Sequence, residues 1–198
     1  MGAPKALLRD RDGRSFVARV LHTLRAAGVA DLTVVTGTLH TQIVNAVAMD
    51  APRHTTIRFA RNPDPAQGQL SSLVVGLDAA DASGVDAALV TLVDVPFVAS
   101  ATVAAVMSTW MRSRAPIVRP VARASSAAAE NGGKRERHGH PVLFARSTFD
   151  ELRRADPARG AKAVVYAHAN DLVQVPVNDE GAMLDLDTRD EYERALKS

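Results

Sequence analysis

Apolar residues recur along this chain with two spacings, and the two alternate from one end to the other. Residues 16–24 carry an apolar stripe at helical spacing, with Ser15 before it as a cap and Gly28 after it as a stop. The next apolar run, residues 32–35, is short and continuous, which is typical of a buried strand. The same patterns predict helices over residues 41–49, 71–80, 148–154 and 161–168, another capped by Ser100, and strands over residues 56–59, 87–93, 116–121, 141–145 and 172–177.

Strands that alternate with helices favour an α/β fold with three layers and a mostly parallel sheet. The apolar run at residues 87–93 predicts a strand buried on both faces. Residues 124–136 interrupt the pattern because they are small, polar and glycine-bearing, and they predict a mobile loop. The 198 residues suffice for one α/β domain with a full core, so we expect a single domain over residues 1–198.

Composition excludes several classes of function. The chain has 24 Lys and Arg against 22 Asp and Glu, and a formal charge of +2 gives no strong case for nucleic acid or membrane partners. Only 4% of residues are aromatic, so stacking on bases is poorly supported. The absence of cysteine excludes disulfides, thiolate nucleophiles and sulfur-ligated zinc, and no apolar run approaches the roughly 20 residues of a membrane span. We expect a cytoplasmic protein.

The segment Gly2–Lys5 carries the first candidate chemistry. A glycine-containing loop brings backbone N–H groups close to a phosphate, and Lys5 supplies a point charge that stabilises the negative charge developing during phosphoryl transfer. The alternative is a lysine that is merely solvated near the start of the chain.

A second candidate is the segment 62–73, which is rich in Pro, Gly and Asn and turns into a helix. Its free N–H groups and the hydroxyls of Ser71 and Ser72 are groups that hydrogen-bond a nucleobase or sugar. An ordinary helix N-cap is the alternative interpretation.

Asp94 stands at the carboxyl end of the run at 87–93, and Pro96 prevents the strand from continuing. Ligand sites in open α/β sheets gather at such strand ends. A carboxylate there suits Mg²⁺, which bridges nucleotide phosphates and neutralises charge on a leaving pyrophosphate. Aspartates also cap helices, which is the competing interpretation.

Two further strings lie in the last third of the chain. Gly139-His140-Pro141 precedes an apolar strand, and Asp185-Leu186-Asp187-Thr188 precedes a final helix that begins with a T-x-x-E capping box. The histidines at positions 138 and 140 suggest zinc, but two histidines without a nearby third ligand rarely make a site.

In chain order, the strings M-G-x-x-K, V-V-T-G, G-x-x-S-S-L, D-x-P, G-H-P and D-x-D-T resemble the MobA-like nucleotidyltransferases, the family of the molybdenum cofactor cytidylyl- and guanylyltransferases. This resemblance implies a Rossmann-like fold of the nucleotide-diphospho-sugar transferase type. It implies a reaction in which CMP or GMP passes from CTP or GTP to a phosphate of molybdopterin, with release of pyrophosphate and with a molybdoenzyme or maturation factor as partner.

The resemblance also assigns roles to individual residues. Lys5, Asp94 and Asp187 would be catalytic, with Asp94 and Asp187 sharing one Mg²⁺. The residues that bind the nucleotide would be Gly2, Lys5, Gly68, Ser71 and Ser72, and those that contact the acceptor would be Gly139 and His140.

The family's first motif begins with a strand and an A-A-G-x-S-x-R turn that do not precede Met1 here. We expect their absence to expose backbone groups and apolar faces of the sheet. The sequence therefore leaves two alternatives open: an inactive nucleotide-binding module, and a nucleotidyltransferase with another phosphorylated acceptor.

Overall fold

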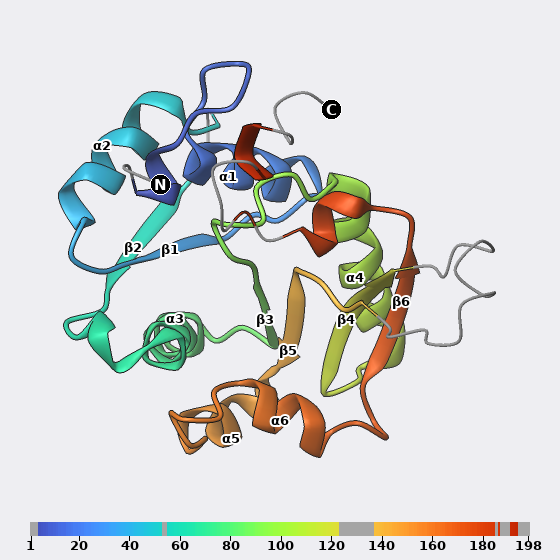
Figure 1. Ribbon diagram of the computed structural model, residues 1–198. Helices are drawn as coiled ribbons and strands as arrows, with labels where there is room; N and C mark the ends of the chain where they lie inside the picture. Colours follow the sequence, from blue (N-terminus) through green and yellow to red (C-terminus); the bar gives the residue numbers. More distant parts are fainter. Residues whose placement is uncertain (1–3, 53–54, 123–136, 185, 187–190, 194–198) are drawn as a thin grey trace.

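The computed structural model describes residues 4–52, 55–122, 137–184, 186 and 191–193 (Figure 1). Each helix and strand that the sequence predicts within these ranges is present. The helices are α1 (Phe16–Ala26), α2 (His40–Asp50), α3 (Gln69–Ala82), α4 (Ser100–Ser113), α5 (Phe149–Arg153) and α6 (Lys162–Ala167), with short 3₁₀ turns η1 (Lys5–Leu7), η2 (Pro65–Gln67), η4 (Arg146–Thr148) and η5 (Glu180–Met183). The strands are β1 (Leu32–Thr36), β2 (Ile57–Arg61), β3 (Ala87–Val90), β4 (Ile117–Ala122), β5 (Val142–Ala145) and β6 (Val173–Val177). The predicted loop at 124–136 lies outside the described residues.

The strands form one pair and one four-stranded sheet. β1 and β2 are parallel, and the larger sheet has the order β3-β5-β4-β6. β5 runs antiparallel to both β3 and β4, while β4 and β6 are parallel, so three of its four strands point the same way. The predicted mostly parallel sheet is confirmed, but the reversal of β5 was not predicted.

β3 corrects one expectation from the sequence. The apolar run at 87–93 predicted a strand buried on both faces, but the strand ends at Val90 and all four of its residues are partly exposed. The chain turns after Val90, with the Val95 N–H donating to the Leu92 carbonyl. Among the described residues, β3 pairs only with β5 and β1 only with β2, so no strand covers the other edge of β3.

Side chains on the two faces of β4 and β5 pack against different helices. Val118 and the paired Leu143 pack with Val106 of α4. Their neighbours Ile117 and Phe144 form a cluster with residues of α3, α5 and α6, namely Leu77, Phe149, Leu152 and Val164. Helices therefore cover both faces of the sheet, and Figure 1 shows α1 and α2 at the top with α5 and α6 at the bottom.

The start of α4 is capped from a distant part of the chain. The sequence predicted Ser100 as the cap, but Asp179 Oδ2 accepts hydrogen bonds from Ala99 N at 2.9 Å and Thr102 Oγ1 at 2.6 Å. Ala99, not Ser100, is the N-cap residue of α4, and Asp179 accepts from its backbone N–H and from the Thr102 hydroxyl in the first turn. The segment after β6 is thereby tied to the start of α4.

Two glycines let the same segment pass close to its neighbours. A Cβ atom on Gly181 would overlap the Phe97 carbonyl, and one on Gly139 would overlap the Ala182 carbonyl. The His140 N–H also donates to that Ala182 carbonyl at 2.9 Å. Backbone thus packs on backbone at both places, and neither position has room for a side chain.

An arginine-centred network joins α3 to α5. Arg153 contacts three aspartates, Asp78 and Asp81 of α3 at 2.9 Å each and Asp150 of its own helix at 2.7 Å. Arg146 adds a second contact to Asp81 at 2.6 Å. The hydrogen bond from Arg153, together with the charge of Arg146, holds the pKa of Asp81 below its ordinary value.

We expect Gly139→Ala to destabilise the protein by about 1–3 kcal/mol, the usual cost of overpacking, because the Ala182 backbone must move. Urea unfolding measures this change. Gly76→Ala in α3 is the control, since the added Cβ would meet a methyl of the Val35 side chain at 3.0 Å, which can rotate away. Equal losses for the two variants would contradict the close approach at Gly139.

The Asp81 network predicts a dependence of stability on pH. A carboxyl group with a lowered pKa in the folded state stabilises the protein above its unfolded pKa, about 3.9, and this contribution is lost as pH falls through the folded value. We expect wild-type protein to be more stable than Asp81→Asn at pH 7 and this advantage to shrink below about pH 4. Thermal unfolding from pH 7 to pH 3 tests it, with Asp31→Asn as an exposed control; a constant advantage would contradict the assignment.

Candidate active site

The sequence-predicted residues Lys5 and Asp94 lie together at the end of β3. Lys5 Nζ is 3.6 Å from Asp94 Oδ2, and the two side chains are 31% and 26% exposed. Lys5 is the first residue of η1, and Asp94 lies within the turn that follows the end of β3 at Val90. A strand end and an N-terminal turn that are distant in the sequence therefore form one charged centre.

The other carboxylate oxygen of Asp94 is suited to a metal ion. Asp94 Oδ1 is buried, and it has no hydrogen-bond partner among the residues that the structure describes. A buried carboxylate oxygen is costly unless a hydrogen-bond donor or a cation satisfies it. Hard divalent cations such as Mg²⁺ and Mn²⁺ prefer oxygen ligands of this kind. Asp94 therefore fits a divalent cation, with Lys5 beside it as a second positive charge.

The second predicted metal ligand, Asp187, lies outside the described residues, as does Gly2. Its neighbour Leu186 is described and fully buried, and the Leu186 N–H donates to the Asp94 carbonyl at 2.9 Å. The D-x-D-T string thus reaches Asp94 through a backbone hydrogen bond. Within the described ranges no group of three or more His, Asp or Glu side chains could hold a metal.

The predicted nucleotide loop after β2 is built around Asn62. This buried side chain donates from Nδ2 to Ser71 Oγ at 2.8 Å and to Ser72 Oγ at 2.9 Å. Gly68 has a φ of +95°, a conformation that favours glycine, and it directly precedes α3. The structure therefore brings Gly68, Ser71 and Ser72 together at the start of one helix.

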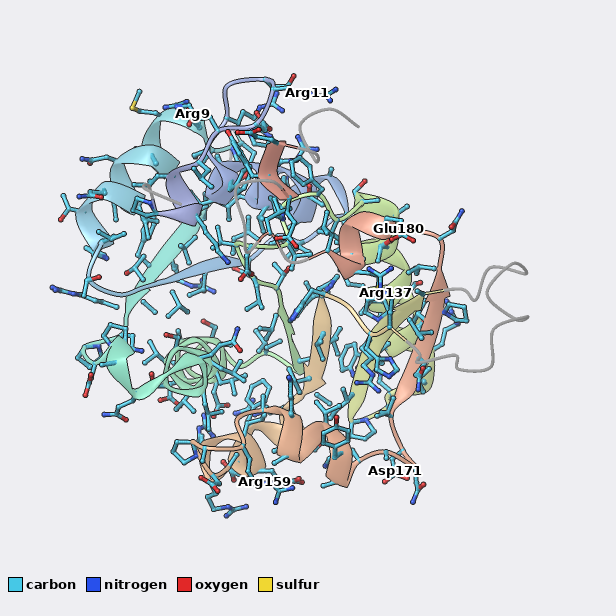
Figure 2. The ribbon with its side chains drawn as sticks, viewed as in Figure 1. Arg9, Arg11, Arg137, Arg159, Asp171 and Glu180 are labelled. Carbon is cyan, nitrogen blue, oxygen red and sulfur yellow. The ribbon has the colours of Figure 1, made fainter. Side chains whose placement is uncertain are left out.

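The predicted acceptor residues Gly139 and His140 lie against η5. Gly139 N donates to the Pro120 carbonyl at 3.2 Å, and next to it Arg137 pairs with Glu180 at 3.1 Å, as Figure 2 shows. A second Arg137 nitrogen donates to the Met183 carbonyl at 3.3 Å. The G-H-P string is thus held to the segment that leads to Leu186. The described contacts do not join the Gly68–Ser72 loop to the Lys5–Asp94 pair.

The sequence analysis did not single out Asp10 and Arg19, which support the turn after Asp94. Arg19 contacts Asp10 at 2.9 Å, donates from Nε to the Pro96 carbonyl at 3.1 Å, and lies 4.7 Å from the Phe97 ring centroid. Burial acts to raise the pKa of Asp10, but hydrogen bonds from Arg19 and the Arg14 backbone outweigh it and lower the pKa. The sequence carried one sign of this network, because Arg19 is a charged residue among the apolar positions of the predicted helix at residues 16–24.

None of the helices in the described part of the chain has the length and apolar character needed to cross a membrane.

Comparison with known proteins gives matches over the whole chain. The family model for the MobA-like NTP transferase domain matches residues 1–172. Rv0371c from Mycobacterium tuberculosis H37Rv is 26% identical, with a TM-score of 0.75 over 100% of this chain and 92% of that one. That protein has also been solved as a complex with manganese, at a TM-score of 0.69, 26% identity, and coverage of 100% and 94%. No curated protein matches the chain.

More distant structures share the fold. A 4-diphosphocytidyl-2C-methyl-D-erythritol synthase from Anaerococcus prevotii has a TM-score of 0.72 at 12% identity, over 98% of this chain and 93% of that one. The fold is the Rossmann-like fold of the nucleotide-diphospho-sugar transferases, as the sequence predicted. The chain belongs to the MobA-like NTP transferase domain family, and it is a nucleotidyltransferase of that type.

Proposed function

We propose that this protein transfers CMP or GMP from CTP or GTP to a phosphate of molybdopterin and releases pyrophosphate. The observation that carries the proposal is the Lys5–Asp94 contact of 3.6 Å, beside a carboxylate oxygen that is buried and has no partner among the described residues. The acceptor is inferred from the G-H-P and D-x-D-T strings, which resemble those of the cytidylyltransferase-like branch of the family.

The reaction needs no covalent intermediate on the protein. An oxygen of the acceptor phosphate attacks the α-phosphorus of the nucleotide and forms a new P–O bond. The bond from the α-phosphorus to the oxygen that bridges to the β-phosphorus breaks, and pyrophosphate leaves with that electron pair. The protein therefore contributes by positioning the two phosphates and neutralising their charge.

Asp94 and Asp187 would hold a divalent cation, which we propose to be Mg²⁺. When bound, this cation neutralises negative charge on the phosphate oxygens. The manganese complex of Rv0371c supports a divalent cation in this family. Lys5 would stabilise the charge on the leaving pyrophosphate, and the backbone of Gly2 would donate to a phosphate.

The remaining residues would bind the organic parts of the substrates. Gly68, Ser71 and Ser72 would contact the nucleotide from the start of α3, where free N–H groups and hydroxyls gather. Gly139 and His140 would contact molybdopterin. A molybdoenzyme or a maturation factor would take up the product, and we place the reaction in the cytoplasm.

We expect Asp94→Asn to lower the rate of pyrophosphate release by about 100-fold or more, because the amide weakens cation binding and removes the negative charge that lies 3.6 Å from Lys5. The assay contains molybdopterin, CTP or GTP, and Mg²⁺ or Mn²⁺. Asp86→Asn is the matched control, since the Asp86 side chain is 81% exposed and its one ion-pair contact among the described residues is with Arg114 at 3.8 Å.

Each outcome has a definite meaning. Wild-type release that requires molybdopterin and is lost in Asp94→Asn supports the proposal. Release with another phosphorylated acceptor, but not with molybdopterin, would correct the acceptor. Nucleotide binding without release from any acceptor would favour the inactive binding module.

A further inference from the structure

Asn62 is a buried polar residue whose side-chain amide and backbone N–H all form hydrogen bonds. Asn62 is only 3% exposed to solvent, and its backbone N–H donates to the Thr36 carbonyl at 2.7 Å. This bond joins the loop after β2 to the last residue of β1. Asn62 is thus anchored to the sheet before its side chain makes any contact.

The orientation of the Asn62 amide follows from its partners. The Asp64 N–H donates to Asn62 Oδ1 at 3.0 Å, so this atom must be the oxygen. The two hydrogens of Nδ2 then go to the two serine hydroxyls, at 2.8 Å and 2.9 Å. An amide N–H₂ group is only a donor, so both serines must accept from it.

The two serines differ in where they can send their own hydrogen. Ser71 Oγ donates to the Gly68 carbonyl at 2.8 Å, so its hydrogen is already used inside the loop. For Ser72 Oγ, the structure gives only the bond that it accepts from Asn62, within the described residues. The Ser72 hydroxyl therefore keeps a hydrogen to donate, and the bond that it accepts keeps this hydrogen from pointing at Asn62 Nδ2.

We propose that Asn62 is a positioning residue for nucleotide binding and acts through the Ser72 hydroxyl, which donates to a neutral acceptor atom of the base or ribose. The proposal rests on the proposed function for its ligand, a nucleoside triphosphate. A neutral hydroxyl suits the nucleoside part, because the charged centre at Lys5 and Asp94 is the one suited to phosphates. The Ser71 hydroxyl instead braces the loop, so Ser71 would contact the nucleotide through its backbone N–H in the first turn of α3.

Calorimetric titration of CTP and GTP in the presence of Mn²⁺ tests this role. We expect Ser72→Ala to weaken binding about tenfold, the scale of one hydrogen bond of about 1.4 kcal/mol. Asn62→Leu, which keeps the shape and removes the donors, should weaken binding by a similar factor. In the double variant, Asn62→Leu should weaken binding little beyond the effect of Ser72→Ala alone. Ser83→Ala, at the far end of α3, is the matched control.

The double variant separates positioning from a merely structural role. If Asn62→Leu weakens binding equally with and without the Ser72 hydroxyl, the residue does not act through Ser72 and the proposal is wrong. Titration with inorganic tripolyphosphate should show no effect of Ser72→Ala. An equal loss there would place the hydroxyl on a phosphate and overturn the proposal.

Folding defects do not obscure the result. If urea unfolding shows that Asn62→Leu is unfolded, Ser72→Ala is compared with Ser71→Ala, and the larger loss of affinity must belong to Ser72. Equal losses would overturn the proposal. Failure of the proposed function looks different: wild type would bind nucleotide with this dependence on Ser72 but release no pyrophosphate.

Discussion

The candidate site depends on one backbone segment that passes closely between two others. In residues 179–184, Asp179 holds the start of α4 and Gly181 lies against the Phe97 carbonyl, and beyond them the Leu186 N–H donates to the Asp94 carbonyl. Ala182, between them, accepts from the His140 N–H. The turn after β3, the entry to β5 and the start of α4 therefore hold one another in place, and the glycines are required because backbone meets backbone.

The two halves of the candidate site differ in how fully their buried polar atoms are hydrogen-bonded. The side chain of Asn62 is saturated with hydrogen bonds, and Asn62 itself is almost fully buried. The Lys5–Asp94 centre is partly exposed and leaves a buried carboxylate oxygen without a partner in the described residues. Satisfied networks fix geometry, whereas an unsatisfied charged oxygen is costly and indicates a ligand. The first half is suited to recognition and the second to charged substrates.

The sequence predicted what depends on local periodicity. The stripe at 16–24 gave α1, and the Pro-Gly-rich string before Ser71 marked the start of α3. Asp94 was singled out because an aspartate two residues before a proline, after an apolar run, is a local signal. The reversal of β5 was missed because strand direction depends on the connection after β4, and the cap by Asp179 was missed because 80 residues separate it from Ala99. Long-range backbone contacts leave no trace in hydrophobic spacing.

The Lys5–Asp94 contact contributes little to the free energy of folding. Two partly exposed charges at 3.6 Å contribute about 1 kcal/mol or less, because water screens them and ordering a lysine side chain costs entropy. This contact therefore adds little to the stability of the fold, and its charges serve the candidate site instead. Asp94 is held differently, since its backbone carbonyl accepts from Leu186 and Arg19 braces the following turn. The backbone on which the Asp94 carboxylate stands is thus fixed by contacts that do not involve Lys5.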